Sequence, residues 1–449
     1  MASPTPLLDL HRRAGATLFA YGPQSQSADS SPTEATATAP PPIDLVATYG
    51  SLELEYAALR KRCALFDMPS RGLVEVTGPE RIEFLNRMVT QELRPGKKDL
   101  PPYAVARSFW LSRKGRIDAD LRICVLPDRV LLVVDALAAP RTASTLSSFI
   151  IMEDCAVHDS SPESHCIALH GPTSRILLAE AFTPNPDAPH INDLPAVGGV
   201  SAGLIATHPV TVVRDDETGV PGFSIFAQAS HALAVSQALV ALGHDAHHDV
   251  PRDGLPLPVL GESGRRAGEI MLTPIGWLAF NIARIEAGTP LFNIDFGTEN
   301  LPAETSLLDS RVSFTKGCYL GQEVVARMHA RKQSKQHLVA IRFETAHAAP
   351  AAGDQASPEG HNPYALLPEQ GAQLLAGPDA DAPAVGRITS STLSPLLGMA
   401  PIALAQVRST HSAPGTVLAA TVDNVPIKGV VQAELRFQVA ATAGAVTRP

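Results

Sequence analysis

The sequence has 449 residues, 45% of them hydrophobic, so it can form two or three packed domains and is not disordered throughout. Its formal net charge of −9 argues against a nucleic-acid-binding surface as the main feature. The five cysteines form no C-x-x-C pair, which argues against a disulfide framework or a cysteine-only zinc site and favours a reducing compartment.

The chain carries no sign of membrane insertion or export. No run of 18 or more apolar residues occurs, so no membrane-spanning helix is expected. The amino-terminal MASPTPLLDLHRRAG lacks the long apolar core of a secretory signal. A mitochondrial transit peptide would hold more arginines and fewer acids than the first 40 residues do. We therefore expect a cytoplasmic protein.

The first elements flank a low-complexity segment. LLDLHRRAGATLF is helix-like, and GSLELEYAALRKRCALFD has apolar residues at helical spacing. Between them, residues 23–42 consist mainly of Pro, Ser, Thr and Ala, which offer too little apolar surface to offset the entropy of ordering. We predict a disordered insertion there.

The next segment predicts a mixed α+β unit. Residues 71–78 alternate as a strand, and residues 79–90 begin with Pro and continue at helical spacing. Residues 107–136 read as two or three strands separated by turns, and the helical AAPRTASTLSSFI follows. Strand, helix, strands, helix is typical of an α+β layer rather than of a doubly wound sheet.

A similar order of elements follows. PESHCIALHGPTSRILLAEAF predicts a strand, a break and a helix, residues 211–227 predict two strands, and residues 230–244 predict a helix. The first part of the chain thus looks like two related α+β units. The HDAHH run at 244–248 lacks partner ligands at metal-site spacing, so no metal site is expected.

The character of the chain changes near residue 337. Short strands separated by Gly and Pro follow, which is typical of a small β-barrel or sandwich. Residues 346–373 are rich in Ala, Pro and Gly and predict a flexible insertion. The predicted domains are therefore residues 1–336 and residues 337–449.

Two stretches contain candidate functional residues. Residues 275–296 predict an amphipathic helix that ends at Gly288, with Arg284 near its end. FTKGCYLGQEVVARMHARK (314–332) places Cys318 just before a predicted helix and two residues from Lys316. A helix amino terminus and a nearby cation both favour a reactive thiolate, but a buried structural cysteine is an equally good reading of the spacing.

These stretches resemble a known family. RIEAGTPLFNIDF, LPAET and the 314–332 run are similar to the YgfZ family of folate-binding proteins that support iron–sulfur enzymes, and in turn to the aminomethyltransferase (T-protein) of the glycine cleavage system. The likeness covers most of the chain. It implies two related α+β units around a central folate-sized channel, followed by a carboxy-terminal β-barrel. The K-G-C-[FY]-x-G-Q-E-x-x-x-R pattern is matched by Lys316, Gly317, Cys318, Tyr319, Gly321, Gln322, Glu323 and Arg327.

The resemblance implies tetrahydrofolate as cofactor and a set of site residues. It assigns Cys318 and Lys316 to the catalytic site. It assigns to folate binding Arg284, Tyr319, Gln322, Glu323 and Arg327.

The chain departs from T-proteins at two places. In the matching run GRIDAD, Ala119 stands at the expected catalytic aspartate, between Asp118 and Asp120. In GVPGFS, Val220 and Ser224 replace two acids of the T-protein pattern. These departures argue against glycine-cleavage chemistry.

Three functions remain open. The first is a tetrahydrofolate-binding accessory protein that supports assembly or repair of iron–sulfur clusters, with iron–sulfur client enzymes or cluster-assembly proteins as partners. The second is a tetrahydrofolate-dependent aminomethyltransferase or related one-carbon transferase. The third is a binding module with a vestigial folate site and a structural Cys318. Glycine-cleavage activity tests the second, and tetrahydrofolate titration tests the third.

Overall fold

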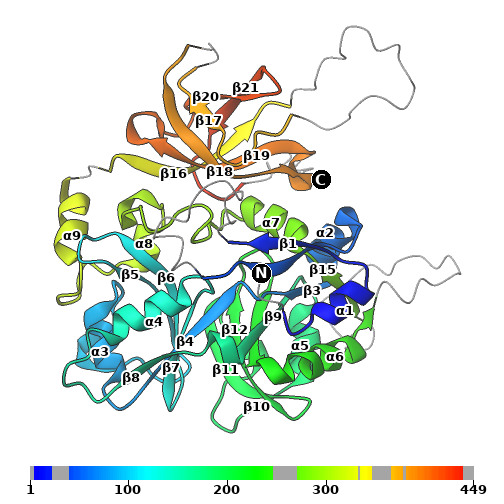
Figure 1. Ribbon diagram of the computed structural model, residues 1–449, viewed down its shortest axis with the longest axis vertical. Helices are drawn as coiled ribbons and strands as arrows, with labels where there is room; N and C mark the ends of the chain where they lie inside the picture. Colours follow the sequence, from blue (N-terminus) through cyan, green and yellow to red (C-terminus); the bar gives the residue numbers. More distant parts are fainter. Residues whose placement is uncertain are drawn as a thin grey trace, which may run out of the picture. The chain divides into compact units, whose positions relative to one another are not determined.

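The computed structural model describes residues 5–22, 40–245, 270–331, 334–345, 366–377 and 381–437 (Figure 1). Contacts divide the chain into two compact units. Unit 1 comprises Met1–Ala283, Gly297–Pro302 and Leu307–Arg331. Unit 2 comprises Arg284–Phe296, Ala303–Ser306 and Lys332–Pro449. The two predicted insertions fall largely outside the described residues.

Unit 1 contains a five-stranded antiparallel sheet. Its strand order is β5 (Val105–Leu111), β6 (Ile117–Val125), β7 (Arg129–Asp135), β4 (Arg71–Thr77) and β8 (Ala156–Asp159). Two helices, α3 (Arg81–Met88) and α4 (Ala139–Ser147), pack their apolar residues against it. Alternation along the strands supplies the apolar face, as the sequence predicts. On β6, for example, Ala119, Leu121 and Ile123 enter this core.

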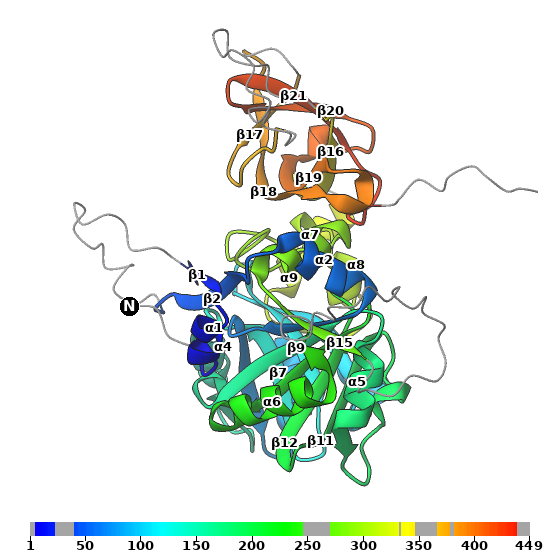
Figure 2. The same cartoon turned by 90° about the vertical axis from the view of Figure 1, so that its right-hand side faces the viewer.

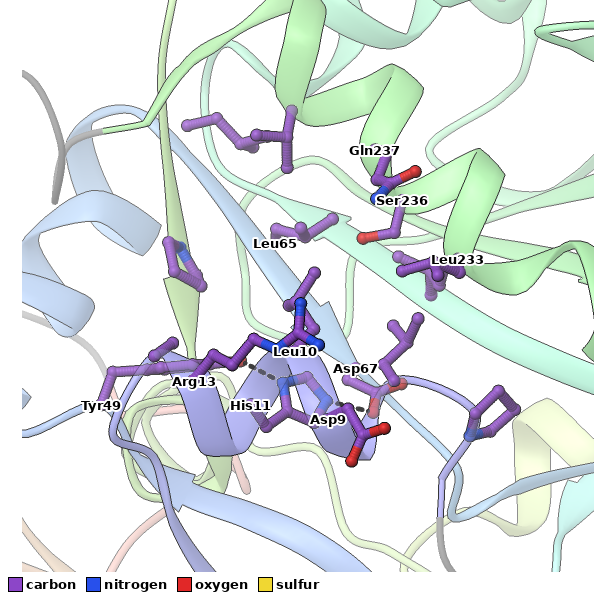
Figure 3. A pocket seen from close by; sticks show the side chains of 17 residues that line it. Asp9, Leu10, His11, Arg13, Tyr49, Leu65, Asp67, Leu233, Ser236 and Gln237 are labelled. Carbon is purple, nitrogen blue, oxygen red and sulfur yellow. Dashed lines mark hydrogen bonds and ion pairs between the residues drawn. The ribbon is translucent and has the colours of Figure 1, made fainter.

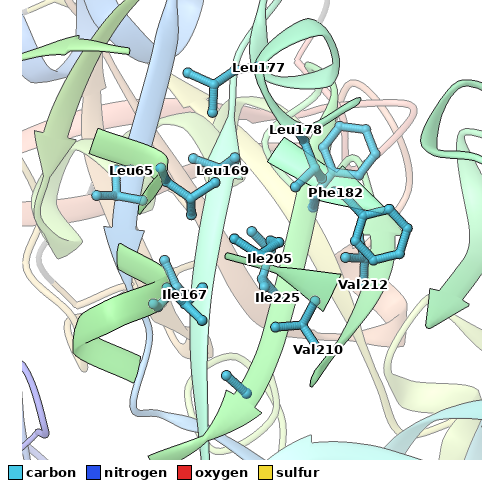
Figure 4. Packing of buried hydrophobic residues seen from close by; sticks show 14 of the residues in the cluster. Leu65, Ile167, Leu169, Leu177, Leu178, Phe182, Ile205, Val210, Val212 and Ile225 are labelled. Carbon is cyan, nitrogen blue, oxygen red and sulfur yellow. The ribbon is translucent and has the colours of Figure 1, made fainter. Parts of the chain in front are cut away.

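Unit 1 also contains an eight-stranded mixed sheet. Its order is β10 (Phe182–Pro184), β11 (Val197–Ile205), β12 (His208–Asp215), β13 (Gly222–Gln228), β9 (Ser164–His170), β3 (Cys63–Asp67), β15 (Met271–Ile275) and β14 (His244–Asp245). Helices α5 (Ser174–Ala181) and α6 (Ala232–Leu242) lie over one face (Figure 2). Leu65, Ile167 and Leu169 from the strands meet Leu177 and Leu178 of α5 in the core between them (Figure 4).

The remaining elements of unit 1 surround these sheets. They are α1 (Leu8–Arg13), β1 (Thr17–Tyr21), β2 (Ile43–Thr48), α2 (Leu52–Lys61), α8 (Leu308–Arg311), α9 (Gln322–Arg331) and most of α7 (Trp277–Glu286). Strands β1 and β2 pair with each other, antiparallel. The predicted helices at the amino terminus, after residue 50 and after residue 321 are thus confirmed.

Unit 2 is built on a closed six-stranded β-barrel. The order is β16 (Gln336–Phe343), β19 (Ala400–Arg408), β18 (Ala384–Ser394), β17 (Gln373–Leu375), β20 (Val417–Val422) and β21 (Val425–Val431). Apolar side chains such as Ile341, Ala403 and Leu418 fill it. The predicted α+β class and carboxy-terminal barrel are confirmed. Residues 284–296 and 303–306, which precede the predicted boundary at 337, group with the barrel.

Among the residues described, no helix has the length and apolar character needed to cross a membrane.

Candidate functional site

The side chain of Lys316, in the K-G-C motif, is buried and connects its loop to a neighbouring segment of the chain. Its Nζ donates hydrogen bonds to the backbone oxygens of Asn86, Val89 and Gln91, at 2.6, 2.7 and 2.9 Å. Burial lowers the pKa of the Lys316 ammonium to about 8, and Glu92 opposes this effect. The motif lysine therefore ties its loop to the end of α3 and the residues that follow it.

Cys318 and Tyr319 are adjacent but lie in different surroundings. Cys318 is exposed, whereas Tyr319 is buried and its ring lies 5.3 Å from the Lys316 Nζ. Burial raises the pKa of Tyr319 to about 12. The exposure of Cys318 argues against the buried structural reading. The Lys316 ammonium donates its hydrogen bonds to backbone carbonyl oxygens. Its predicted effect on the reactivity of the Cys318 thiol stays a prediction.

The motif helix α9 starts against the turn between β5 and β6. Gly321 has a φ of +80°, and a Cβ there would lie 3.0 Å from the Ser112 oxygen, so the motif glycine permits this close approach. Beyond it, Gln322 is half-buried, whereas Glu323 and Arg327 are exposed. The predicted folate contacts of these three side chains and of Tyr319 stay predictions.

Strand β6 presents its acids on the face opposite Ala119. Ala119 is fully buried in the apolar core of the five-stranded sheet. Asp118 pairs with Arg141 at 2.9 Å, and Asp120 pairs with Arg311 at 2.8 Å. Burial raises the pKa of Asp118, and Arg141 opposes this effect. A carboxylate at position 119 would face the core, so the acids available to a ligand on this strand are its two neighbours.

A largely buried charge cluster joins the two sheets of unit 1; we define it as Arg71, Arg107, Arg122, Asp215 and Glu217. Arg71 Nη2 donates to Glu217 Oε2 at 2.6 Å, and Arg122 Nη2 lies 3.0 Å from Glu217 Oε1. Arg107 and Arg122 both pair with Asp215. The three arginines come from β4, β5 and β6, whereas the carboxylates come from the end of β12 and the turn after it.

The cluster perturbs the acidity of its members. Burial lowers the pKa of Arg122 to about 10 and also lowers that of Arg107. Burial alone would raise the pKa of Glu217, but Arg71 and Arg122 lower it to about 2. Sequence reasoning missed this cluster because its residues lie far apart in the chain and match no motif.

Arg284 belongs to a separate network inside unit 2. Its side chain is 1% exposed. Its Nη1 donates to Asp295 Oδ2 and its Nη2 to Ser390 Oγ, both at 2.5 Å. These bonds link the end of α7 to the barrel strand β18. Its predicted contact with folate stays a prediction beside this structural role.

Unit 1 also contains a cavity of about 540 Å³ between α1 and α6, which the sequence did not predict (Figure 3). At one side, Asp67 accepts hydrogen bonds from Thr5, His11 and His165, at 2.7, 2.6 and 2.5 Å. Burial alone would raise the pKa of Asp67, but the two histidines hold it below its ordinary value. The guanidinium of Arg13 points into the cavity in Figure 3. The volume is in the range of small-molecule sites.

Metal-ligating side chains are not grouped in the described part of the chain: no three His, Cys, Asp or Glu residues could together hold an ion.

Comparison with known proteins identifies both parts of the chain. The GCVT N-terminal domain matches residues 34–250, and the Glycine cleavage T-protein C-terminal barrel domain matches residues 359–437. An aminomethyltransferase of Streptomyces coelicolor is 28% identical over 379 residues, which cover 83% of this chain and 86% of the relative. An aminomethyltransferase of Halothermothrix orenii is 24% identical over 427 residues, covering 95% and 98%.

A solved structure shows the same fold. The glycine cleavage system aminomethyltransferase T of Bartonella henselae superimposes with a TM-score of 0.72 at 20% identity, covering 98% of this chain and 99% of that one. With both domains present in the same order along the chain, the protein belongs to the GcvT-like superfamily.

Proposed function

We propose that the protein binds tetrahydrofolate in unit 1 and acts in one-carbon transfer of the aminomethyltransferase type. The observation that carries this proposal is the match of one chain to both GcvT-like domains. Two relatives named aminomethyltransferase align over 83% and 95% of the chain. Tetrahydrofolate, the cofactor predicted from the sequence, is the one that aminomethyltransferases of this family use.

The residues present in unit 1 fit a folate. A folate offers N–H groups and a carbonyl on its pterin ring and carboxylates on its tail. The partly buried carboxylate of Asp120 can accept from N–H groups, and the charge cluster supplies guanidinium donors. Bound tetrahydrofolate supplies the nitrogen that accepts a one-carbon unit. In this proposal Asp120 takes the stabilising role that the sequence comparison had placed at position 119.

Turnover and titration test the proposal together. We expect the unmodified protein to bind tetrahydrofolate and to release ammonia from an aminomethylated lipoyl carrier protein. Asp120→Asn should lower turnover by about 100-fold or more, as for loss of a catalytic carboxylate. Asp128→Asn, at an exposed acid between β6 and β7, is the matched control. Absence of tetrahydrofolate binding would overturn the proposal.

A second candidate is support of iron–sulfur enzymes, as in the YgfZ family. It is favoured by the exposure of Cys318, which the buried Lys316 and Tyr319 flank within the K-G-C motif. A thiolate at such a place could bind iron or attack a disulfide. The partners would be iron–sulfur client enzymes or cluster-assembly proteins. In this candidate function the protein works in the reducing cytoplasm that the sequence predicts.

A deletion strain separates the two candidates. Cys318→Ser should abolish rescue of iron–sulfur enzyme activity if the accessory function holds, with turnover on the lipoyl carrier unchanged. If Cys318→Ser rescues iron–sulfur enzyme activity fully and Asp120→Asn loses turnover on the lipoyl carrier protein, one-carbon transfer is the remaining candidate function.

A further inference from the structure

The cavity between α1 and α6 is lined mainly by apolar side chains. Leu65, Ile167 and Leu272, from β3, β9 and β15, line it from the side of the eight-stranded sheet, and all three are buried. Leu233 of α6 lines it as well, but this leucine is 43% exposed. An apolar ligand in the cavity would cover such a side chain and remove its surface from water, which is favourable.

Ser236 of α6 presents a hydroxyl group to the cavity. The residue is 1% exposed, and its hydroxyl points into the cavity (Figure 3). A serine inside a helix usually faces solvent or donates to the carbonyl oxygen four residues earlier. Ser236 does neither, because its hydroxyl makes no hydrogen bond to any residue that the structure describes. Buried polar groups are seldom left unpaired, so this hydroxyl indicates a hydrogen-bonding atom on a ligand.

Arg13 of α1 supplies a positive charge at the same cavity. Its guanidinium points into the cavity (Figure 3) and pairs with no other side chain in the described ranges. The two carboxylates of the lining have other partners. Asp67 is held by the threonine and the two histidines named above, and Asp9, which is 86% exposed, lies 4.0 Å from Arg12. The charge of Arg13 is therefore available to a ligand.

We propose that this cavity binds a small amphipathic monocarboxylate. The apolar body of the ligand lies against the leucines of the lining, its carboxylate accepts hydrogen bonds from Arg13, and Ser236 donates to a ligand oxygen. One guanidinium balances one negative charge, and its planar set of N–H groups suits a carboxylate. A volume of about 540 Å³, an apolar lining and a few polar groups are typical of a small-molecule site.

The cavity and the charge cluster lie on opposite faces of the eight-stranded sheet. On β12, Val210 and Val212 enter the core beneath α5 and α6, together with the lining residues Leu65 and Ile167. Side chains alternate along a strand, so Asp215 faces the other way, where it pairs with arginines of the five-stranded sheet. The proposed ligand is therefore separate from folate at the cluster, and the inference does not depend on the proposed function.

Octanoate and octanol are suitable probes, because they share an apolar chain and differ in charge. Isothermal titration calorimetry of the full-length wild type at neutral pH should show saturable binding of octanoate below its micellar concentration. Arg13→Gln removes the charge, so octanoate affinity should fall about 5-fold, which corresponds to about 1 kcal/mol for an exposed ion pair. The affinity for octanol should stay unchanged. Ser236→Ala should lower octanoate affinity about 2- to 10-fold through loss of one hydrogen bond.

Arg175→Gln is the matched control. Arg175 is an exposed arginine on α5 of the same unit and is not among the residues that line the cavity. This variant should bind octanoate as the wild type does. The proposal is overturned if octanoate does not saturate the wild type or if Arg13→Gln binds it as Arg175→Gln does. Equal losses of octanoate and octanol affinity in Arg13→Gln would also overturn it, since they would show that the charge recognises no carboxylate.

Tetrahydrofolate titrated into octanoate-saturated protein tests whether the cavity is a separate site. We expect both ligands to bind at once. Mutual exclusion of octanoate and tetrahydrofolate would overturn the cavity as a separate site. Octanoate binding without any tetrahydrofolate binding would retain the cavity site and reject the proposed function.

Discussion

Lys316 is a charged side chain whose hydrogen-bonding partners are all backbone carbonyl oxygens. Replacing it by methionine keeps the apolar stem but leaves three acceptors, on Asn86, Val89 and Gln91, without their donor. Each unsatisfied buried acceptor costs about 1–3 kcal/mol. We expect Lys316→Met to lower the free energy of unfolding by about 2–5 kcal/mol in urea titrations. The exposed Lys98→Met should change it little; equal effects of the two substitutions would contradict the anchoring role.

His170 predicts a pH dependence of stability. Burial lowers the pKa of His170 to about 4, and Arg71 adds to this effect while Glu217 opposes it. Between pH 6.5 and 4 the unfolded state therefore binds a proton that the folded state does not. Stability should fall as pH falls through this window, by up to about 1.4 kcal/mol per pH unit.

Substituting His170 by glutamine removes this titration. The free energy of unfolding of His170→Gln should fall less steeply between pH 6.5 and 4 than that of the wild type. His158→Gln, at an exposed histidine on β8, should keep the wild-type slope. A parallel slope in His170→Gln would show that folding does not change proton binding at this histidine.

Single residues also show what the sequence could predict. Lys316 and Cys318 were found because they share one short motif. Arg71, Arg107, Arg122 and Glu217 were missed because their relation exists only once two sheets are brought together. That Ala119 rather than Asp118 or Asp120 turns into the core depends on which face of β6 packs against the helices, and the letters alone do not reveal this.

At the scale of elements, most helices and strands followed from local pattern. Alternation predicted β4, β12 and β13, and helical spacing predicted α6 and α9. Strand order did not follow, because β3 pairs with β9 and β15, which lie far away in the sequence. Such pairings depend on long-range packing rather than on local preference.

The break between β9 and α5 gives a prediction at this scale. Gly171 has a φ of +120°, and a Cβ there would lie 2.2 Å from the Arg62 backbone oxygen. Gly50 has a similar φ of +107°, but a Cβ there would meet nothing within 4 Å. Both Gly→Ala substitutions therefore add backbone strain of about 1–3 kcal/mol, and only Gly171→Ala adds a clash with backbone.

We expect Gly171→Ala to lower the urea midpoint clearly more than Gly50→Ala does. The difference in urea midpoint between the two variants measures the cost of the clash with the Arg62 backbone, separately from the cost of the positive φ. Equal midpoints would mean that the chain at Arg62 moves aside without cost.

At the scale of the whole molecule, the sequence predicted both the α+β part and the barrel but divided them at one point. The structure interleaves them: α7 begins in unit 1, and its last residues group with the barrel. A single helix therefore contributes to both units. The hydrophobic spacing of α7 predicts the helix but not which of its residues packs into which core.

This interleaving gives a test of how the two units unfold. Both tryptophans, Trp110 and Trp277, belong to unit 1, so fluorescence reports on that unit, whereas circular dichroism reports on both. Arg284→Met leaves the buried carboxylate of Asp295 without its ion-pair partner, which costs about 3–5 kcal/mol. We expect part of the circular-dichroism transition to move to lower temperature while the fluorescence transition, to which both tryptophans contribute, moves less. Arg387→Met, exposed on β18 of the same unit, should leave both transitions in place. If both signals shift together in Arg284→Met, then the units unfold as one, because α7 couples the loss of the barrel to the loss of unit 1.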